Sequence, residues 1–224
     1  DHDIIRKGSN MVDLLQSFSN HKIDVLIGTQ MIAKGLDFPN VTLVGIINAD
    51  LGFHIPDFRS SERIFQLIYQ AAGRSGRGEK KGEVVIQTYD INNPVIQAAS
   101  KLDLNKYYEI MLKDRLVLKY PPYSWIVKIE FIGSNSKTVF SLSNKIKNNL
   151  FNHYKGLEVL GPAACFREKI KNHFRFQIVL KSLKKYDSNG ERLHHFINDN
   201  FYKNKNINMG SNKIHIHIDP LSMI

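Results

Sequence analysis

The feature that most constrains the fold is the segment KYPPYS at residues 119–124, where the order of predicted strands and helices changes. Two consecutive prolines remove backbone donors and disfavour helix in the residue before them, so regular structure is expected to stop there. The chain has 224 residues, which is enough for one large domain or two small ones. We therefore expect two domains, at residues 1–118 and 119–224.

The first half alternates strands with helices. Short runs rich in β-branched residues predict strands at residues 24–28, 41–50 and 82–89. Between the last two, an apolar stripe at helical spacing predicts a helix over residues 60–73, formed by Ile64, Leu67, Ile68 and Ala71. Strands that alternate with helices are typical of a parallel sheet in an α/β layer.

Capping signals place a further helix before the proline segment. Asn93 can cap its first turn, and Pro94 suits the first helical position. We expect this helix to run to about residue 115.

The second half has a different order of predicted strands and helices. Strands are predicted at residues 125–132, 157–166, 174–182 and 213–219, with helices at about 136–153 and 190–201. The resulting order, β-α-β-β-α-β, is that of the ferredoxin-like fold, an antiparallel sheet with both helices on one face.

The net charge of the chain indicates which class of partner it binds. Lys and Arg outnumber Asp and Glu by 31 to 21, which gives a net charge of +10 and suggests a polyanion such as nucleic acid. A basic, Lys-rich proteome would produce the same excess.

The single cysteine, Cys165, excludes an internal disulfide and a Cys-cluster zinc site. No apolar run is of membrane-spanning length, so we expect no membrane partner. The chain begins without Met and without a signal-like segment, and we expect a piece of a longer cytoplasmic protein.

The motif Q-x-x-G-R-x-G-R follows the helix at residues 60–73, with Gln70, Arg74 and Arg77 at its polar positions. Arginines present planar forks of donors that match phosphate oxygens, and glycines allow a ligand to approach the backbone. Alone, the motif would fit a solvated basic turn. It is preceded by IGTQMIAKGLDFPNV at residues 27–41, and in this order the two segments resemble motifs V and VI of superfamily 2 helicases.

The wider resemblance is to the PriA family of primosomal replication-restart DNA helicases. It covers essentially the whole chain and rests on DFRSSERIFQLIYQAAGRSGR, KYPPYSWIVKIEF, GPAACFREKIKNHFRFQIVLK and IHIHIDPLSM. The resemblance implies the C-terminal part of such a helicase, with a partial second RecA-like lobe and a C-terminal domain that binds DNA or partners.

The resemblance also implies a nucleotide site that needs ATP and Mg²⁺. Arg74 and Arg77 would reach the nucleotide phosphates, and Gln70 would position them or the attacking water. Gly35 and Asp37 would lie at the nucleotide's edge. The sequence contains no G-x-x-x-x-G-K-[ST] motif, so we expect this chain alone to be inactive.

For DNA, the resemblance points to Thr29 as a phosphate contact, although a Thr that caps the next turn fits equally well. Arg59 lies in a loop of interleaved arginines and aromatics that suits either single-strand stacking or attachment of the loop to its own domain. A predicted hairpin tip carries four basic residues, which could bind DNA phosphates or simply be solvated at the surface: Arg167, Lys169, Lys171 and Arg175. Lys181, Lys184 and Lys185 would continue this positive charge.

His215 and His217 lie on one face of the last predicted strand. Without a nearby carboxylate or cysteine pair they would make a poor metal site, so no metal ligand is expected in this chain.

The family's partners would be DNA forks, single-stranded DNA, single-strand-binding protein and primosome proteins, in the bacterial cytoplasm. Its zinc would sit in an insertion outside this chain. Two other interpretations stay open: another superfamily 2 helicase, or a non-catalytic nucleic-acid-binding module.

Overall fold

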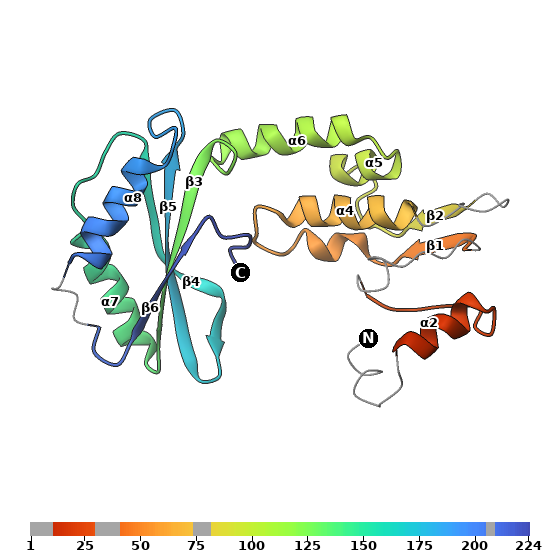
Figure 1. The fold of residues 1–224 in the computed structure, drawn as a ribbon, viewed down its shortest axis with the longest axis horizontal. Coiled ribbons are helices and arrows are strands. Elements are labelled where there is room, and N and C mark those ends of the chain that lie inside the picture. The colour runs from red at the N-terminus through yellow and green to blue at the C-terminus, as the bar shows by residue number, and fades with distance from the viewer. Residues whose placement is uncertain (1–10, 30–40, 74–81, 205–208) are drawn as a thin grey trace. The chain divides into compact units, whose positions relative to one another are not determined.

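A computed structural model of the protein describes residues 11–29, 41–73, 82–204 and 209–224, and Figure 1 shows its ribbon. The chain divides into two compact units. The first comprises Asp1–Ile55 and Ser60–Ile110, and the second comprises Pro56–Arg59 and Met111–Ile224. The described part of each unit contains one β-sheet.

The first unit combines a short parallel sheet with helices. Its elements are α2 (Met11–Ser19), β1 (Leu43–Ile46), a 3₁₀ turn (Ala49–Gly52), α4 (Ser60–Ala72), β2 (Glu83–Ile86) and α5 (Pro94–Ser100), and α6 (Leu104–Val117) begins in it. β1 and β2 pair in parallel, with Leu43 opposite Glu83 and Ile46 opposite Ile86. The predicted α/β class is therefore confirmed.

The apolar stripe of α4 is the inner face of this unit. Ile64, Ile68 and Ala71 are buried, as the helical spacing predicts. Phe65 is also buried, and its ring stacks on that of Tyr107 in α6 with centroids 4.0 Å apart. The helix ends at Ala72, next to Gly73.

The strand predicted at residues 24–28 is wrong. This segment has neither helix nor strand, and Val25 and Ile27 are 70% and 80% exposed. β-branched residues favour a strand only where a neighbouring strand supplies the hydrogen-bond ladder. In the described ranges, β1 and β2 pair only with each other.

The single helix predicted from Asn93 to about residue 115 is two helices. The Asn93 cap is confirmed, since its side chain accepts hydrogen bonds from the backbone amides of Val95 and Ile96. After α5 the chain breaks at Leu102, whose φ is +53°, and Asp103 Oδ1 accepts from the Lys106 amide at 2.9 Å to start α6. A second cap therefore interrupts the helix.

The second unit follows the predicted order of strands and helices. Its elements after α6 are β3 (Ser124–Gly133), α7 (Ser136–Asn148), β4 (Leu157–Ile170), β5 (His173–Leu183), α8 (Glu191–Ile197), a π-helical turn (Asn198–Tyr202) and β6 (Lys213–Ile218). The sheet order is β4-β5-β3-β6, and every neighbouring pair is antiparallel.

Of the two helices of this unit, α7 is shorter than predicted, whereas α8 and its π-helical turn together end at Tyr202, close to the predicted residue 201. α7 stops at Asn148 instead of residue 153, and its cap is Asn135, whose side chain accepts from the Thr138 amide. The α-helical hydrogen bonding of α8 stops at Ile197 and becomes π-helical up to Tyr202. Helix ends are set by which groups satisfy the terminal amides and carbonyls, and apolar periodicity does not report this.

One face of the sheet packs against α7 and α8, which lie on the same side of it (Figure 1). Val127, Ile129 and Phe131 alternate along β3 and are fully buried. They join a core with residues from both helices and β5: Val139, Leu142, Ile146, Phe176, Ile178, Leu180, Leu193, Phe196 and Ile197. Strand alternation at period two therefore defines this core.

Asp187 fixes the start of α8. The residue is 2% exposed, and its carboxylate accepts hydrogen bonds from the backbone amides of Arg192 and Leu193 at 3.1 and 3.0 Å. The Ser182 hydroxyl also donates to it, at 2.8 Å, and Tyr154 donates to Ser182 in turn. Burial is the largest cause that raises the pKa of the Tyr154 hydroxyl, to about 12. One carboxylate thus joins β5 to the first turn of α8.

We predict that Asp187→Ala lowers the free energy of unfolding of the second unit by about 2–4 kcal/mol. Such a loss is typical when buried donors lose their acceptor and a helix loses its cap. The measurement is urea unfolding followed by the fluorescence of Trp125, the only tryptophan of the chain, whose ring nitrogen donates to the Asp187 carbonyl. Lys203→Ala, at an exposed ion pair, is the control and should cost under about 1 kcal/mol. Equal losses in both variants would contradict this role.

Candidate functional site

The predicted nucleotide residues fall largely outside the described structure. Gly35, Asp37, Arg74 and Arg77 lie in segments that the description does not cover. Gln70 is described and lies exposed on the last turn of α4. Thr29 is also exposed, at a bend of the chain and not at the end of a strand. The roles of these residues stay predictions.

Within the loop at residues 50–63, Phe58 and Asp57 are held by contacts within the second unit. Within the second unit, the ring of Phe58 stacks on Tyr120 with centroids 4.9 Å apart, and the Arg115 guanidinium lies 5.2 Å from the same ring. Asp57 is buried and accepts from the Ser222 hydroxyl at 2.6 Å and from the Arg59 amide at 3.0 Å. These contacts favour attachment over base stacking for Phe58, but the attachment is within the second unit and not, as expected, to residues 1–118. Arg59 is half-buried.

The basic hairpin exists where the sequence predicts it. β4 and β5 meet in a turn at Lys171 and Asn172, whose φ values are +46° and +64°, the two-residue turn that suits a twisted hairpin. Arg167, Lys169 and Lys171 are exposed. The Lys169 ammonium lies 4.9 Å from the centre of the Phe174 ring. Three cations therefore surround this end of the sheet.

Arg175 differs from the other three predicted basic residues. Its side chain is 16% exposed, and its Nε donates to Glu130 Oε1 in an ion pair. Its Nη1 donates to the Arg167 carbonyl at 3.4 Å. Arg175 thus has structural partners within its own sheet, in contrast to a surface cation.

Lys181 is not part of the surface charge, and the prediction that it continues the basic patch is wrong. The residue is 5% exposed, its ammonium donates to the Leu118 carbonyl at 2.8 Å, and it lies 3.7 Å from the centre of the Tyr120 ring. Burial lowers the pKa of this ammonium below its ordinary value. A charged end can be buried when a carbonyl and an aromatic face replace water.

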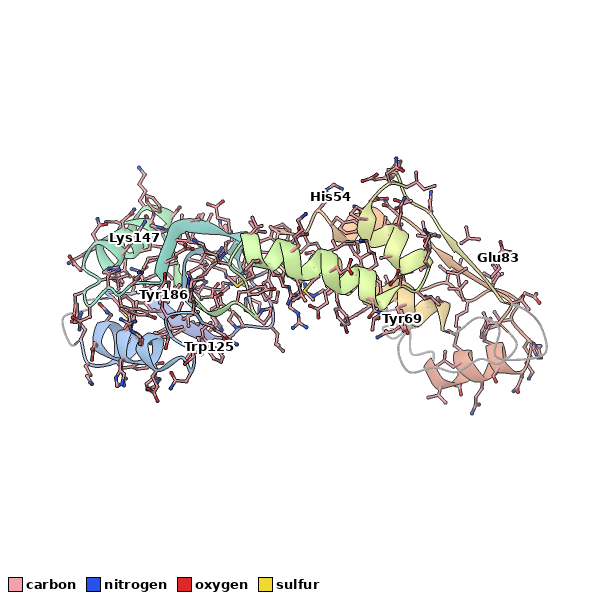
Figure 2. The ribbon with its side chains drawn as sticks, turned by 90° about the horizontal axis from the view of Figure 1, so that it is seen from above. His54, Tyr69, Glu83, Trp125, Lys147 and Tyr186 are labelled. Carbon is pink, nitrogen blue, oxygen red and sulfur yellow. The ribbon has the colours of Figure 1, made fainter. Side chains whose placement is uncertain are left out.

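Lys184 and Lys185 lie over aromatic rings. Their ammonium groups are 4.0 Å from the ring centre of Trp125 and 5.9 Å from that of Tyr186, respectively. Both rings are labelled in Figure 2. Lys184 is half-buried and Lys185 is exposed, so these cations partly face solvent.

The face of the sheet opposite the helices carries a buried polar cluster that the sequence did not reveal. Lys128 and Glu130 of β3 are 3% and 4% exposed. Cys165 of β4 lies within an irregular stretch of its pairing with β5, between Ala164 and Lys169, and its Sγ is 3.9 Å from Glu130 Oε1. Burial is the largest cause that raises the pKa of this thiol, to about 11.

The charge of Glu130 is maintained by its neighbours. Burial raises the pKa of its carboxyl, but the hydrogen bond from Arg175 and the surrounding positive charges outweigh burial, and the net pKa lies below the ordinary value. His217 Nε2 lies 3.5 Å from Glu130 Oε2, and His215 is opposite Glu130 in the register of β6 with β3. The premise that no carboxylate is near the two histidines is therefore wrong. Strand register, which the sequence does not encode locally, brings them together.

Two family models match the chain. Residues 117–221 match the primosomal protein N C-terminal domain, and residues 6–79 match the helicase conserved C-terminal domain. The replication restart protein PriA of Chlamydia pneumoniae is 41% identical over 190 residues, which cover 84% of this chain and 25% of that protein. This chain belongs to the PriA family.

Further PriA proteins show the same partial coverage. The PriA of Bacillus subtilis is 43% identical over 180 residues, and that of Treponema pallidum is 39% identical over 190. These matches cover 79% and 81% of this chain, but 22% and 28% of the relatives. The chain thus spans about a quarter of the length of the PriA proteins it matches. In the described part of the chain, no helix is both long and apolar enough to cross a bilayer.

Proposed function

We propose that this chain is the C-terminal part of an ATP-dependent DNA helicase that acts in replication restart and primosome assembly at stalled forks. The observation that carries the proposal is the similarity to proteins named replication restart protein PriA over about four fifths of the chain. That similarity includes both the helicase segment and the domain after the proline segment. The alternatives are another superfamily 2 helicase and a non-catalytic nucleic-acid-binding module.

The first unit, in this proposal, belongs to a RecA-like lobe and forms one wall of the nucleotide site. Its parallel β1–β2 pair and the exposed end of α4 at Gln70 fit this assignment. Arg74 and Arg77 follow α4 directly in the sequence and would act on the phosphates of ATP bound with Mg²⁺. Gly35 and Asp37 would touch the same nucleotide. The chain alone would lack the Walker A lysine and would not hydrolyse ATP.

The predicted second domain, residues 119–224, is the larger part of the second unit and has in this proposal a ferredoxin-like fold that binds DNA. Its strand order and the placement of α7 and α8 on one face support that fold. A sheet that recognises RNA needs exposed aromatic side chains on which bases can stack. Phe176 does not meet this requirement, because it is buried and packs against Phe140 of α7. Arg167, Lys169 and Lys171 are the DNA contacts we favour, with Thr29 and Arg59 as further candidates.

The partners in this proposal are fork DNA, single-stranded DNA, single-strand-binding protein and primosome proteins, and the compartment is the bacterial cytoplasm. The net charge of +10 agrees with a nucleic-acid partner.

We predict that Arg74→Ala and Arg77→Ala, placed in a complete PriA that contains this chain, lower kcat for DNA-stimulated ATP hydrolysis by about 10³-fold or more. Arginines that meet charge formed in the transition state have effects of this size. DNA affinity should stay within about twofold, since these donors would serve the nucleotide. Lys80→Ala removes a charge nearby in the sequence and is the control. Loss of DNA binding with normal ATP turnover on saturating DNA would instead make the arginines DNA contacts.

We predict that Lys169→Gln with Lys171→Gln flattens the salt dependence of DNA binding. Each lost phosphate contact should reduce the slope of log K against log salt by about 0.9 for duplex and about 0.7 for single strands. Fluorescence anisotropy of labelled forks at several salt concentrations measures this slope. The control is Lys137→Gln with Lys145→Gln, two exposed lysines of α7, which removes the same charge from the helical side of the sheet.

Two results of this titration are decisive. Equal slope changes in both double variants would mean that net charge alone acts, and the hairpin would not be a contact site. An unchanged slope in the hairpin variant would move DNA binding elsewhere, with Lys184 and Lys185 as the next candidates.

A further inference from the structure

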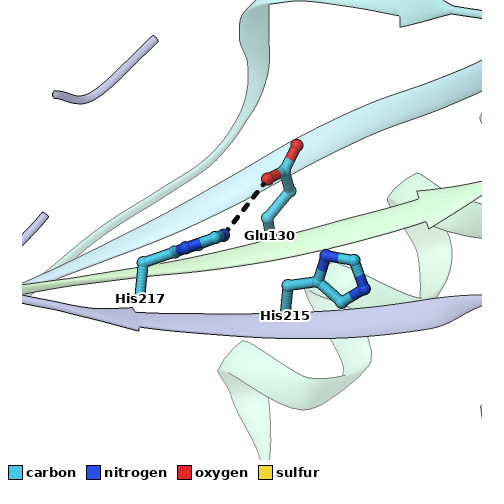
Figure 3. A group of neighbouring side chains, drawn as sticks. All are labelled: Glu130, His215 and His217. Carbon is cyan, nitrogen blue, oxygen red and sulfur yellow. Dashed lines mark ion pairs between the residues drawn. The ribbon is translucent and has the colours of Figure 1, made fainter.

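Glu130, His215 and His217 present three donor groups at one place on the polar face of the second unit's sheet (Figure 3). The three side chains come from neighbouring strands, β3 and β6, whose register puts Glu130 opposite His215 and Lys128 opposite His217. Alternation along β6 places both histidines on the face that Glu130 occupies. One ligand atom from each residue lies within 4.8 Å of the other two. In the described part of the chain, no other group of three such residues was found.

We propose that these three residues form a binding site for a divalent transition-metal ion of the Zn²⁺ type. Two imidazoles and one carboxylate are a recurrent donor set for zinc and for non-haem iron, whereas Mg²⁺ and Ca²⁺ prefer oxygen ligands alone. Three protein ligands leave a coordination position for water or another ligand. The site is independent of the helicase assignment.

The carboxylate is already held in place. Glu130 is 4% exposed, and it uses Oε1 for Arg175 while Oε2 faces His217 at 3.5 Å. The oxygen nearest the histidines is therefore not the one that accepts from Arg175. A carboxylate can accept a hydrogen bond on one oxygen and bind a metal with the other, and such partners orient metal ligands in many sites.

The two imidazole rings can move to bring the ligand atoms to the separations that a bound ion requires. Around a tetrahedral ion with bonds of about 2.0–2.1 Å, the ligand atoms lie about 3.4 Å apart. Ligand atoms that lie at the 4.8 Å limit must therefore approach one another by about 1.4 Å. His215 is exposed and the His217 side chain is 46% exposed, so both rings can rotate without repacking a core.

Neighbouring charged groups limit the metal affinity of this site. Arg175 and Lys128 place positive charge beside Glu130, which opposes a second cation, so binding should be weaker than in closed structural zinc sites. Cys165 Sγ lies 3.9 Å from Glu130 Oε1, the oxygen that accepts from Arg175, and so on the side away from the oxygen that faces His217. The ligand set is thus His₂Glu without a thiolate.

A bound metal would link the edge strand β6 to the inner strand β3. Ligands that bind only the folded state stabilise it by mass action. Zinc should therefore raise the unfolding midpoint of the second unit, which the single tryptophan reports.

Isothermal titration of the 224-residue chain with Zn²⁺ at neutral pH tests the proposal. One equivalent should bind, and His215→Gln or His217→Gln should each weaken binding by about tenfold or more. His194→Gln with His195→Gln is the matched control, because these two exposed histidines of α8 are also neighbours, with ring centres 6.2 Å apart. Their loss should leave the affinity unchanged.

Co²⁺ in place of Zn²⁺ identifies the ligands by absorption. Cys165→Ser should leave its spectrum unchanged, since no thiolate is involved. Glu130→Gln should also weaken binding, but this variant can unfold because it leaves Arg175 unpaired, so the histidine variants decide the question. The proposal is overturned if no saturable binding occurs, or if the double variant His215→Gln, His217→Gln binds Zn²⁺ as the native chain does.

Discussion

The second unit depends on the ion pair between Glu130 and Arg175. Glu130 lies on β3, an inner strand that is buried on both faces over most of its length. A carboxylate in such a place is stable as an ion only if a partner replaces its lost hydration. Arg175 of β5 is that partner. The negative charge on β3 is therefore balanced by a positive charge on β5. The two residues are diagonal neighbours, because Glu130 pairs directly with Gln177, two residues after Arg175.

This pairing divides the basic residues of the unit into two groups. Arg175 and Lys181 are largely buried and have acceptors within the unit, so their charges stabilise the polar face and are not displayed to a polyanion. Arg167, Lys169 and Lys171 are exposed at the end of the β4–β5 hairpin. The exposed cations that we propose as phosphate contacts are thus separate from the charges that the fold itself requires. The same polar face offers the second oxygen of Glu130 to the histidines of β6.

Local patterns predicted part of this structure. Helical spacing predicted α4, the Asn93 side chain predicted the start of α5, and period-two alternation predicted β6. The break at Leu102 and the early end of α7 depend on capping groups that compete with apolar periodicity. The failed strand at residues 24–28 had the right composition but no neighbouring strand to pair with. The Glu130 cluster and the burial of Lys181 depend on strand register and on the path of β4, which arise from tertiary packing.

The measurement that tests this account most directly is a double-mutant cycle on Glu130 and Arg175. The variants are Glu130→Gln, Arg175→Met and the double change, each unfolded in urea with Trp125 fluorescence as the signal. If the pair balances buried charge, Arg175→Met alone should cost about 3–5 kcal/mol, because it removes the hydrogen-bonded partner of a buried carboxylate. The double variant should recover a coupling energy of about 2 kcal/mol or more. Additive losses, with a coupling energy under about 0.5 kcal/mol, would contradict the account.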